Sequence, residues 1–232
     1  MADLAVLVPS RGRPMNVARL VDACKRTCEL DTVLHFGFDS DDPELTSNVM
    51  AAGGSLVTTH DRMGLAAWTN QLAREHRETP FLASLGDDMV PFTHGWDRIL
   101  TGAATPRGMA YPEDLRGPQH GHQPGIPEAI VMDSVIVRAL GWMCLPALHH
   151  WYVDNVWRDL GTATGCLVFR PDVIVEHRHP NVPGGDKPDA TYSDAARRYS
   201  TDLAAYQRWR LRGMATDIAA IRRVRTQAPD PL

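Results

Sequence analysis

The sequence predicts an α/β fold built on a mostly parallel central sheet, with helices on both faces and a long helical segment at the C-terminus. Short apolar runs alternate with helix-like segments over the first ninety residues. Within the helix-like segments, apolar residues recur at helical spacing. Successive strand and helix pairs are typical of a parallel sheet, which collects its ligands at the carboxyl ends of its strands.

The elements of the first half follow in order along the chain. The expected strands are short apolar runs bounded by turn residues, and they lie at 4–8, 33–38, 55–59 and 80–85. The expected helices show apolar residues at helical spacing, and they lie at 17–28, 44–52 and 65–77.

The second half is less regular. A loop rich in Gly, Pro and His is expected over 106–128, and loops of this length usually serve function or are disordered. The elements expected after it are strands at 129–132, 166–169 and 173–177 and helices at 134–140, 152–160 and 193–225.

Length and composition limit the classes of protein. The chain has 232 residues, 44% hydrophobic and 22% charged, which excludes a collagen-like, disordered or disulfide-stapled chain. No apolar run approaches the roughly 18 residues of a membrane helix, and the N-terminal apolar run is too short for a secretory signal. The expected location is therefore the cytoplasm of a bacterium or of an infected host. The four cysteines form no CxxC pair, which favours reduced core thiols.

The net charge of -4 is unevenly distributed along the chain. Residues 1–190 contain 16 basic and 24 acidic residues, whereas residues 191–232 contain 8 basic and 4 acidic ones. The basic tail could hold a nucleic-acid backbone. Alternatively it is an amphipathic helix that leaves its arginines in solvent and packs on the domain through Leu203, Tyr206, Leu211 and Ile218. The packing alternative is favoured.

The most informative segment is FLASLGDDMV, an apolar strand that ends in two adjacent carboxylates, Asp87 and Asp88. Such carboxylates repel each other unless a cation lies beside them. Oxygen ligands of this kind suit Mg²⁺ or Mn²⁺, which in turn bind phosphates. Because Gly-Asp-Asp is also ordinary turn sequence, a solvated turn is the alternative.

Further charged residues follow the other strands. Arg11 and Arg13 come after the first strand, and Asp39 ends the second. A nucleotide lying across these strand ends could use Arg11 for phosphate and Asp39 for a base or ribose edge. Each of these residues taken alone is best explained as a surface charge, but together they form a charged rim on an apolar sheet, which favours a ligand site.

Two histidines, His177 and His179, stand in the segment EHRHP after an apolar strand. Because side chains alternate along a strand, both lie on one face, where either could complete a metal site begun by the aspartates. His177 is the expected ligand, since Pro180 restricts the backbone of His179 and favours a turn role there. A surface or hydrogen-bonded core histidine is the alternative.

Asp154 begins a predicted helix among aromatic residues in HHWYVDNVWRDLG. It is either an acid that the helix dipole favours at this position or a general base. Apolar surroundings would move the pKa of such a carboxyl toward the working range of a base.

Several motifs are absent from the sequence. It contains no GxGxxG after the first strand, no GxxxxGK[ST], no HExxH and no GxSxG. Dinucleotide oxidoreductases, P-loop NTPases, zincins and serine hydrolases therefore lose their usual support.

The segments VLVPSRGRPMNVARLVDA, GLAAWTNQLA and FLASLGDDMVPFTHGWD resemble the donor-binding half of GT-A fold glycosyltransferases. The resemblance is to the family-2-like group, with the compact style of bacteriophage members, and it covers residues 4–180. It implies a nucleotide-sugar-binding half over 1–104, an acceptor-binding half of the same domain over 105–190, and a helical extension over 191–232.

The resemblance also implies roles for individual residues. Asp88 and His177 would hold the metal ion, and Asp154 would be the catalytic base of an inverting enzyme. Trp96, Trp151 and Tyr152 would lie on the acceptor side. The motif reads Gly-Asp-Asp instead of Asp-x-Asp, so Asp88 is the safer ligand and Asp87 is assigned to the ribose or sugar. The residues implied to bind the donor are Pro9, Ser10, Arg11, Asp39, Arg62 and Asp87.

The implied activity is that of a hexosyltransferase dependent on Mn²⁺ or Mg²⁺. It would move a sugar from a nucleotide sugar, with UDP favoured, to an acceptor hydroxyl. The acceptor could be a hydroxylated DNA base, a protein or a glycan. A nucleotidyltransferase acting on a sugar phosphate and a non-catalytic nucleotide-sugar-binding module are the two alternatives.

Overall fold

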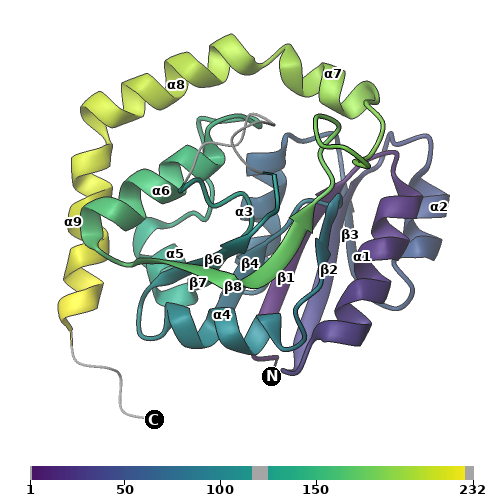
Figure 1. Ribbon diagram of the computed structural model, residues 1–232. Helices are drawn as coiled ribbons and strands as arrows, with labels where there is room; N and C mark the ends of the chain where they lie inside the picture. The colour runs from purple at the N-terminus through teal and green to yellow at the C-terminus, as the bar shows by residue number, and fades with distance from the viewer. Residues whose placement is uncertain (1, 117–124, 228–232) are drawn as a thin grey trace.

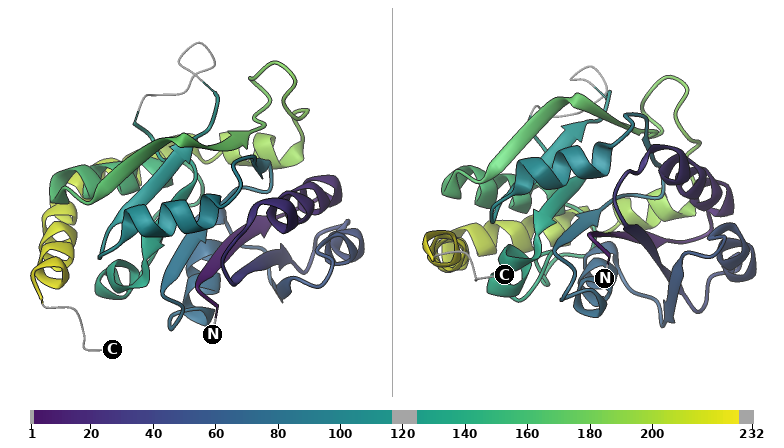
Figure 2. Two further views of the ribbon diagram at one scale, coloured as in Figure 1. Left: turned by 60° about the horizontal axis from the view of Figure 1, so that its bottom comes forward. Right: turned by 90° about the horizontal axis from the view of Figure 1, so that it is seen from below.

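The computed structural model describes residues 2–116 and 125–227 of the chain. Within them an eight-stranded sheet in the order β3-β2-β1-β4-β7-β6-β8-β5 is covered by helices on both faces (Figure 1). The C-terminal helices run across one end of the sheet and down its side (Figures 1 and 2). No helix among these residues combines the length and the apolar character of a membrane span.

The first half has the predicted alternation of strands and helices. Strands β1, β2, β3 and β4 are mutually parallel, because β1 pairs with β2 and β4, and β2 pairs with β3. The elements of this half are β1 (Leu4–Ser10), α1 (Pro14–Thr27), β2 (Thr32–Asp39), α2 (Leu45–Ala51), β3 (Leu56–His60), α3 (Leu65–Glu75) and β4 (Phe81–Ser84).

The second half adds antiparallel pairs, because β7 runs against β4 and β5 runs against β8. Its elements are β5 (Met89–Pro91), α4 (Trp96–Ala104), β6 (Met109–Glu113), β7 (Ile130–Asp133), α5 (Ser134–Leu140), α6 (Val153–Thr164) and β8 (Leu167–His177). The α/β fold with a mostly parallel sheet is confirmed. The division of the chain at residues 104 and 190 stays a prediction.

Two predictions for this half are wrong. The expected loop 106–128 contains strand β6, which pairs with both β7 and β8, while residues 117–124 of that loop lie outside the described part of the chain. The two strands expected at 166–169 and 173–177 form the single strand β8. The Gly and Pro residues of these segments do not favour strands locally. Strand β6 and the continuous strand β8 form because they pair with segments distant in the sequence.

The predicted C-terminal helix is divided into three: α7 (Ala190–Ala196), α8 (Tyr199–Arg212) and α9 (Met214–Thr226). Helix α9 lies beside α5 and α6 (Figure 1). Tyr206 is 7% exposed and Ile218 packs against the core, as the packing alternative expects. Leu211 is 85% exposed, so the prediction that it packs is wrong.

The core has one layer on each face of the sheet. Helices α1 and α4 bury Val17, Leu20 and Leu100 on one face. On the other face α3, α5 and α6 are joined by Trp209 of α8 and Ile221 of α9. The C-terminal helices therefore contribute to the core on one face of the sheet.

Candidate active site

The predicted acidic pair lies at the carboxyl ends of the parallel strands. Asp87 and Asp88 follow β4, beside Ser10 at the end of β1. His177 ends β8, which pairs with β5 so that His177 stands opposite Met89. The backbone N–H of Arg178 also donates to the carbonyl of Asp88, at 2.9 Å. Strand pairing therefore brings His177, 89 residues away in the sequence, next to Asp88.

Asp87 is 4% exposed and has a partner on each carboxylate oxygen. Its Oδ2 accepts from the Ser10 hydroxyl at 2.5 Å, and its Oδ1 accepts from Nη1 of Arg13 at 3.0 Å. Burial raises the pKa of Asp87 to about 6, with Asp88 adding to the rise and Arg13 opposing it. Arg13 and Ser10 thus hold this carboxyl in a fixed orientation.

Asp88 is the point at which the charged groups of the site meet. Its Oδ2 accepts from the Tyr192 hydroxyl at 2.5 Å and lies 3.4 Å from Nε2 of His177 and 4.0 Å from Nη1 of Arg13. Burial alone would raise the pKa of Asp88, but His177, Tyr192 and Arg13 outweigh it and hold that pKa well below its usual range. Against the effect of burial, Asp88 and Glu128 raise the pKa of His177 to about 10.

The arrangement of Asp88 and His177 fits a divalent cation. A carboxylate oxygen and an imidazole nitrogen point to one place, and their 3.4 Å separation is close to the roughly 3 Å expected between neighbouring ligands about 2.1 Å from one ion. No group of three or more His, Cys, Asp or Glu residues arranged for a metal occurs in the described residues. Two protein ligands suffice where substrate phosphates and water complete the coordination, as is usual for Mg²⁺.

Asp154 lies in the first turn of α6, where its Oδ1 accepts from the N–H of Asn155 at 2.8 Å. Burial and then the negative charge of Glu128 raise the pKa of Asp154 to about 6. A carboxyl with a pKa near neutrality suits a general base. The same Glu128 binds His177, so the charge of Glu128 acts on both His177 and Asp154.

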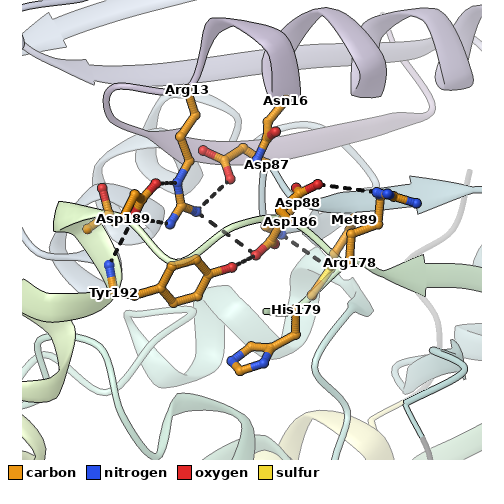
Figure 3. A network of polar contacts seen from close by, with 12 residues as sticks. Arg13, Asn16, Asp87, Asp88, Met89, Arg178, His179, Asp186, Asp189 and Tyr192 are labelled. Atoms are coloured by element: carbon orange, nitrogen blue, oxygen red, sulfur yellow. Dashed lines mark hydrogen bonds and ion pairs between the residues drawn. The ribbon is translucent and has the colours of Figure 1, made fainter. Parts of the chain in front are cut away.

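Helix α7 brings residues to the site that the sequence did not identify (Figure 3). Asp189, its N-cap, accepts from Nε and Nη2 of Arg13 at 2.7 and 2.9 Å. The Arg13 guanidinium lies 4.4 Å from the ring centre of Tyr192. The sequence identifies Arg13 only as a charge after the first strand. Asp189 and Tyr192 carry no local sequence signal, because only the return of the chain over the sheet places them here.

The other residues expected to bind the donor lie on the same edge of the sheet. Asp39 is 3% exposed and accepts from Trp68 Nε1 at 2.7 Å, from the N–H of Met63 at 3.0 Å and from Arg11 at 3.1 Å. Arg11 therefore binds Asp39 directly. Pro9 is half-buried in β1. Arg62 forms an ion pair with Asp194 of α7.

The predicted acceptor-side aromatics have different environments. Trp96, the first residue of α4, is 0% exposed in the core, so the prediction that it contacts an acceptor is wrong; its apolar ring is used for packing. Trp151 is 36% exposed and donates from Nε1 to the carbonyl of Ala195 at 2.7 Å. Tyr152 stacks on Tyr206 with the ring centres 5.0 Å apart. The acceptor roles of Trp151 and Tyr152 stay predictions, and both residues contact the C-terminal helices.

No protein-family model matches the sequence, and no curated protein matches it. Among solved structures, the fold is similar to that of a mannosyltransferase from Pyrobaculum calidifontis, solved with GDP-Man and Mn²⁺. The identity is 12% and the TM-score 0.59, over 95% of this chain and 73% of that one.

Two other similar structures come from bacteria. TarS of S. aureus, a fragment solved with UDP, is 10% identical with a TM-score of 0.57, over 75% of this chain and 59% of that one. Glucosyl-3-phosphoglycerate synthase of Mycobacterium tuberculosis, solved with Mn²⁺, UDP and phosphoglyceric acid, is 12% identical with a TM-score of 0.58, over 88% of this chain and 78% of that one. This chain therefore spans less than two thirds of the TarS fragment. At these identities the similarity establishes the fold, which is the α/β fold of GT-A type.

Proposed function

We propose that the protein is a metal-dependent glycosyltransferase that moves a hexose from a nucleotide sugar, with UDP as the favoured nucleotide, to an acceptor hydroxyl. The observation that carries the proposal is the convergence of Asp88 and His177 at the carboxyl ends of the sheet, 3.4 Å apart. The GT-A type fold supports it, since the similar proteins were solved with UDP or GDP-Man.

The charges of the site suit a sugar diphosphate. Asp88 and His177 would hold a Mn²⁺ or Mg²⁺ ion, which supplies positive charge to the leaving diphosphate. Arg13 adds a guanidinium on the same side. Burial lowers its pKa, but its carboxylate partners Asp189, Asp87 and Asp88 outweigh burial and leave that pKa above its ordinary value. Arg13 therefore stays charged at every working pH. It can bind a phosphate oxygen in place of one of its carboxylate partners.

Asp154 is the proposed general base. It would take the proton from the acceptor hydroxyl while that oxygen attacks the anomeric carbon, and the bond to the diphosphate would break in the same in-line displacement. One displacement of this kind inverts the configuration at carbon. The pKa of Asp154, about 6, leaves it mostly ionised and ready to accept a proton at neutral pH.

A hydroxylated DNA base is the acceptor we propose, and protein and glycan hydroxyls are the alternatives. The support is the charge of the C-terminal helices. The exposed arginines include Arg208, Arg212 and Arg223. In contrast, Asp202 is 0% exposed and Asp217 accepts from Trp209 Nε1. Outward-facing arginines without exposed acids between them suit a phosphate backbone.

The proposed function is tested by measuring UDP release from UDP-hexoses, with GDP-Man as a second donor, in the presence of Mn²⁺. The acceptor panel contains DNA with hydroxymethylated bases, protein and glycans. We expect Asp88→Ala to lower turnover by about 10²–10³-fold, because the leaving group loses its charge stabilisation. The matched control is Asp172→Ala, which removes an exposed carboxylate on β8 that pairs only with Arg170 among the described residues.

Three results would contradict the proposal. A folded Asp88→Ala variant with full turnover would remove the metal from the mechanism. Pyrophosphate release from a nucleoside triphosphate and a sugar phosphate would favour a nucleotidyltransferase. Nucleotide-sugar binding without transfer to any acceptor would favour a binding module. If DNA is the acceptor, its binding falls steeply as salt rises, because phosphate contacts release counterions.

A further inference from the structure

The two ring nitrogens of His177 have different partners. Nε2 faces Asp88 Oδ2 at 3.4 Å, whereas Nδ1 is hydrogen-bonded to Oε2 of Glu128, 49 residues earlier in the chain. The side chains of His177 and Glu128 are 12% and 13% exposed. The imidazole is therefore held between two carboxylates, one on the proposed cation side and one behind the ring.

Glu128 is itself fixed by a buried cation. Its second carboxylate oxygen, Oε1, forms an ion pair with Nη1 of Arg116, whose side chain is 9% exposed. The backbone of this region is tied to the same strand end, since the N–H of His177 donates to the carbonyl of Asp114 at 3.0 Å. The segment after β6 thus supplies Arg116, and the segment before β7 supplies Glu128, both directed toward the end of β8.

An imidazole that donates Nδ1–H to a carboxylate and has released its Nε2 proton presents the Nε2 lone pair to a cation, and its ring cannot rotate away. The carboxylate also increases the electron density that the ring offers to a metal. We propose that Glu128, held by Arg116, is a positioning residue that orients His177 and thereby sets the affinity of the cation site. The proposal rests on the proposed function, because it concerns the metal of that site.

The test measures the binding of Mn²⁺ to the full chain by isothermal titration calorimetry, without donor or acceptor. Glu128→Ala is expected to weaken Mn²⁺ binding by about 10–100-fold, the usual effect of removing the partner of a histidine ligand. Glu128→Gln keeps an oxygen that accepts from Nδ1–H, so it should restore most of the affinity. The matched control is Glu176→Gln, next to His177 but paired with Arg178, and its Mn²⁺ affinity should equal that of the wild type.

A double-mutant cycle separates positioning from a general structural effect. If Glu128 acts through His177, then adding Glu128→Ala to His177→Ala should change Mn²⁺ affinity by less than about 2-fold. Circular dichroism and thermal melting check that each variant folds. Glu128→Leu, which keeps the side-chain volume, replaces Glu128→Ala if the latter does not fold.

The outcomes distinguish the inference from the proposed function. Wild-type affinity in Glu128→Ala, together with lost affinity in His177→Ala, overturns the role of Glu128 and leaves the metal site intact. An equal loss from Glu128→Ala with and without His177 also overturns it. If the wild-type chain binds no Mn²⁺ at all, the metal-dependent function and this inference both fail.

Discussion

Buried His35 and partly buried His76 form a hydrogen-bonded pair that depends on the protonation of the two rings. Nδ1 of His35 lies 2.8 Å from Nε2 of His76, and Nε2 of His35 lies 2.9 Å from the hydroxyl of Thr58. Burial lowers the pKa of both histidines. His76 lowers the pKa of His35 further, and Glu75 opposes the decrease for both rings. A hydrogen bond between two rings needs one nitrogen as acceptor, so the pair exists only while at least one ring is neutral.

This pair predicts a loss of stability on mild acidification. The folded-state pKa values lie below the ordinary 6.5, so the unfolded chain binds more protons as the pH falls. The contribution is complete above pH 6.5 and is lost as the pH falls through and below that value. Urea unfolding should give a lower free energy of unfolding at pH 5.5 than at pH 7.5, and His76→Asn should reduce this difference. An identical pH dependence in wild type and variant would contradict this account.

The site residues differ in how far the sequence predicted them. Asp87 and Asp88 directly follow an apolar strand, and such strand ends meet at one edge of a parallel sheet. Glu128 had no such signal, because its partner His177 is brought in by the pairing of β8 with β5. The Trp96-Asp97 pair, part of the resemblance, is structural: buried Asp97 accepts from the backbone N–H groups of Glu29 and Leu30. Residue type alone does not distinguish an aspartate of the candidate site from one, such as Asp97, that has a structural role.

At the scale of elements, the contact between β2 and α3 depends on one glycine. A Cβ added to Gly37 would lie 2.4 Å from Cε3 of Trp68, closer than real carbon atoms approach. Trp68 is 2% exposed and is held from its other side by the hydrogen bond to Asp39. The ring therefore cannot move aside without breaking that bond.

Gly37→Ala should destabilise the protein by about 1–3 kcal/mol, the range of overpacked core substitutions. Gly102→Ala is the matched control, since an added Cβ in α4 meets nothing within 4 Å and alanine favours a helix. Chemical denaturation measures both variants, and tryptophan fluorescence reports any shift of Trp68. Equal midpoints for Gly37→Ala and wild type would show that α3 adjusts freely.

The sequence predicted elements wherever local pattern and final pairing agree. Strands β1 to β4 are apolar runs bounded by turns, and each was expected within one or two residues of its observed position. Strand β6 was missed because MAYPE has few strand-forming residues, and β8 was divided at Pro171. In both cases pairing between distant segments overrides the local signals.

At the scale of the whole molecule, one buried carboxylate fastens α8 to the segment before α6. Asp202 of α8 is 0% exposed and accepts from the backbone N–H groups of His149, His150 and Trp151 at 3.0, 2.8 and 2.9 Å. Those groups precede α6, which carries Asp154. Asp202 therefore connects helix α8 to the segment that leads into α6, the helix of the proposed base Asp154.

Asp202→Ala should destabilise the protein by about 2–4 kcal/mol, because it removes a fully buried carboxylate that accepts from three backbone N–H groups. Asp202→Asn keeps acceptor oxygen at the same place and should cost less. Guanidinium unfolding gives the free energies, with Asp172→Ala as the exposed control. A loss no greater than that of the control would mean that water or another group satisfies these donors.

The contact between Tyr192 and Asp88 also has a consequence for biosynthesis. The two residues are 104 positions apart, so at about 5–20 residues per second Asp88 is synthesised roughly 5–20 s before Tyr192. His177 is also made late in that interval. Arg13, by contrast, precedes the acidic pair, and it is the first of the site's cations that the growing chain can offer to Asp87 and Asp88. Because of this order of synthesis, Arg13 is available to neutralise Asp87 and Asp88 before His177 and Tyr192 have been synthesised.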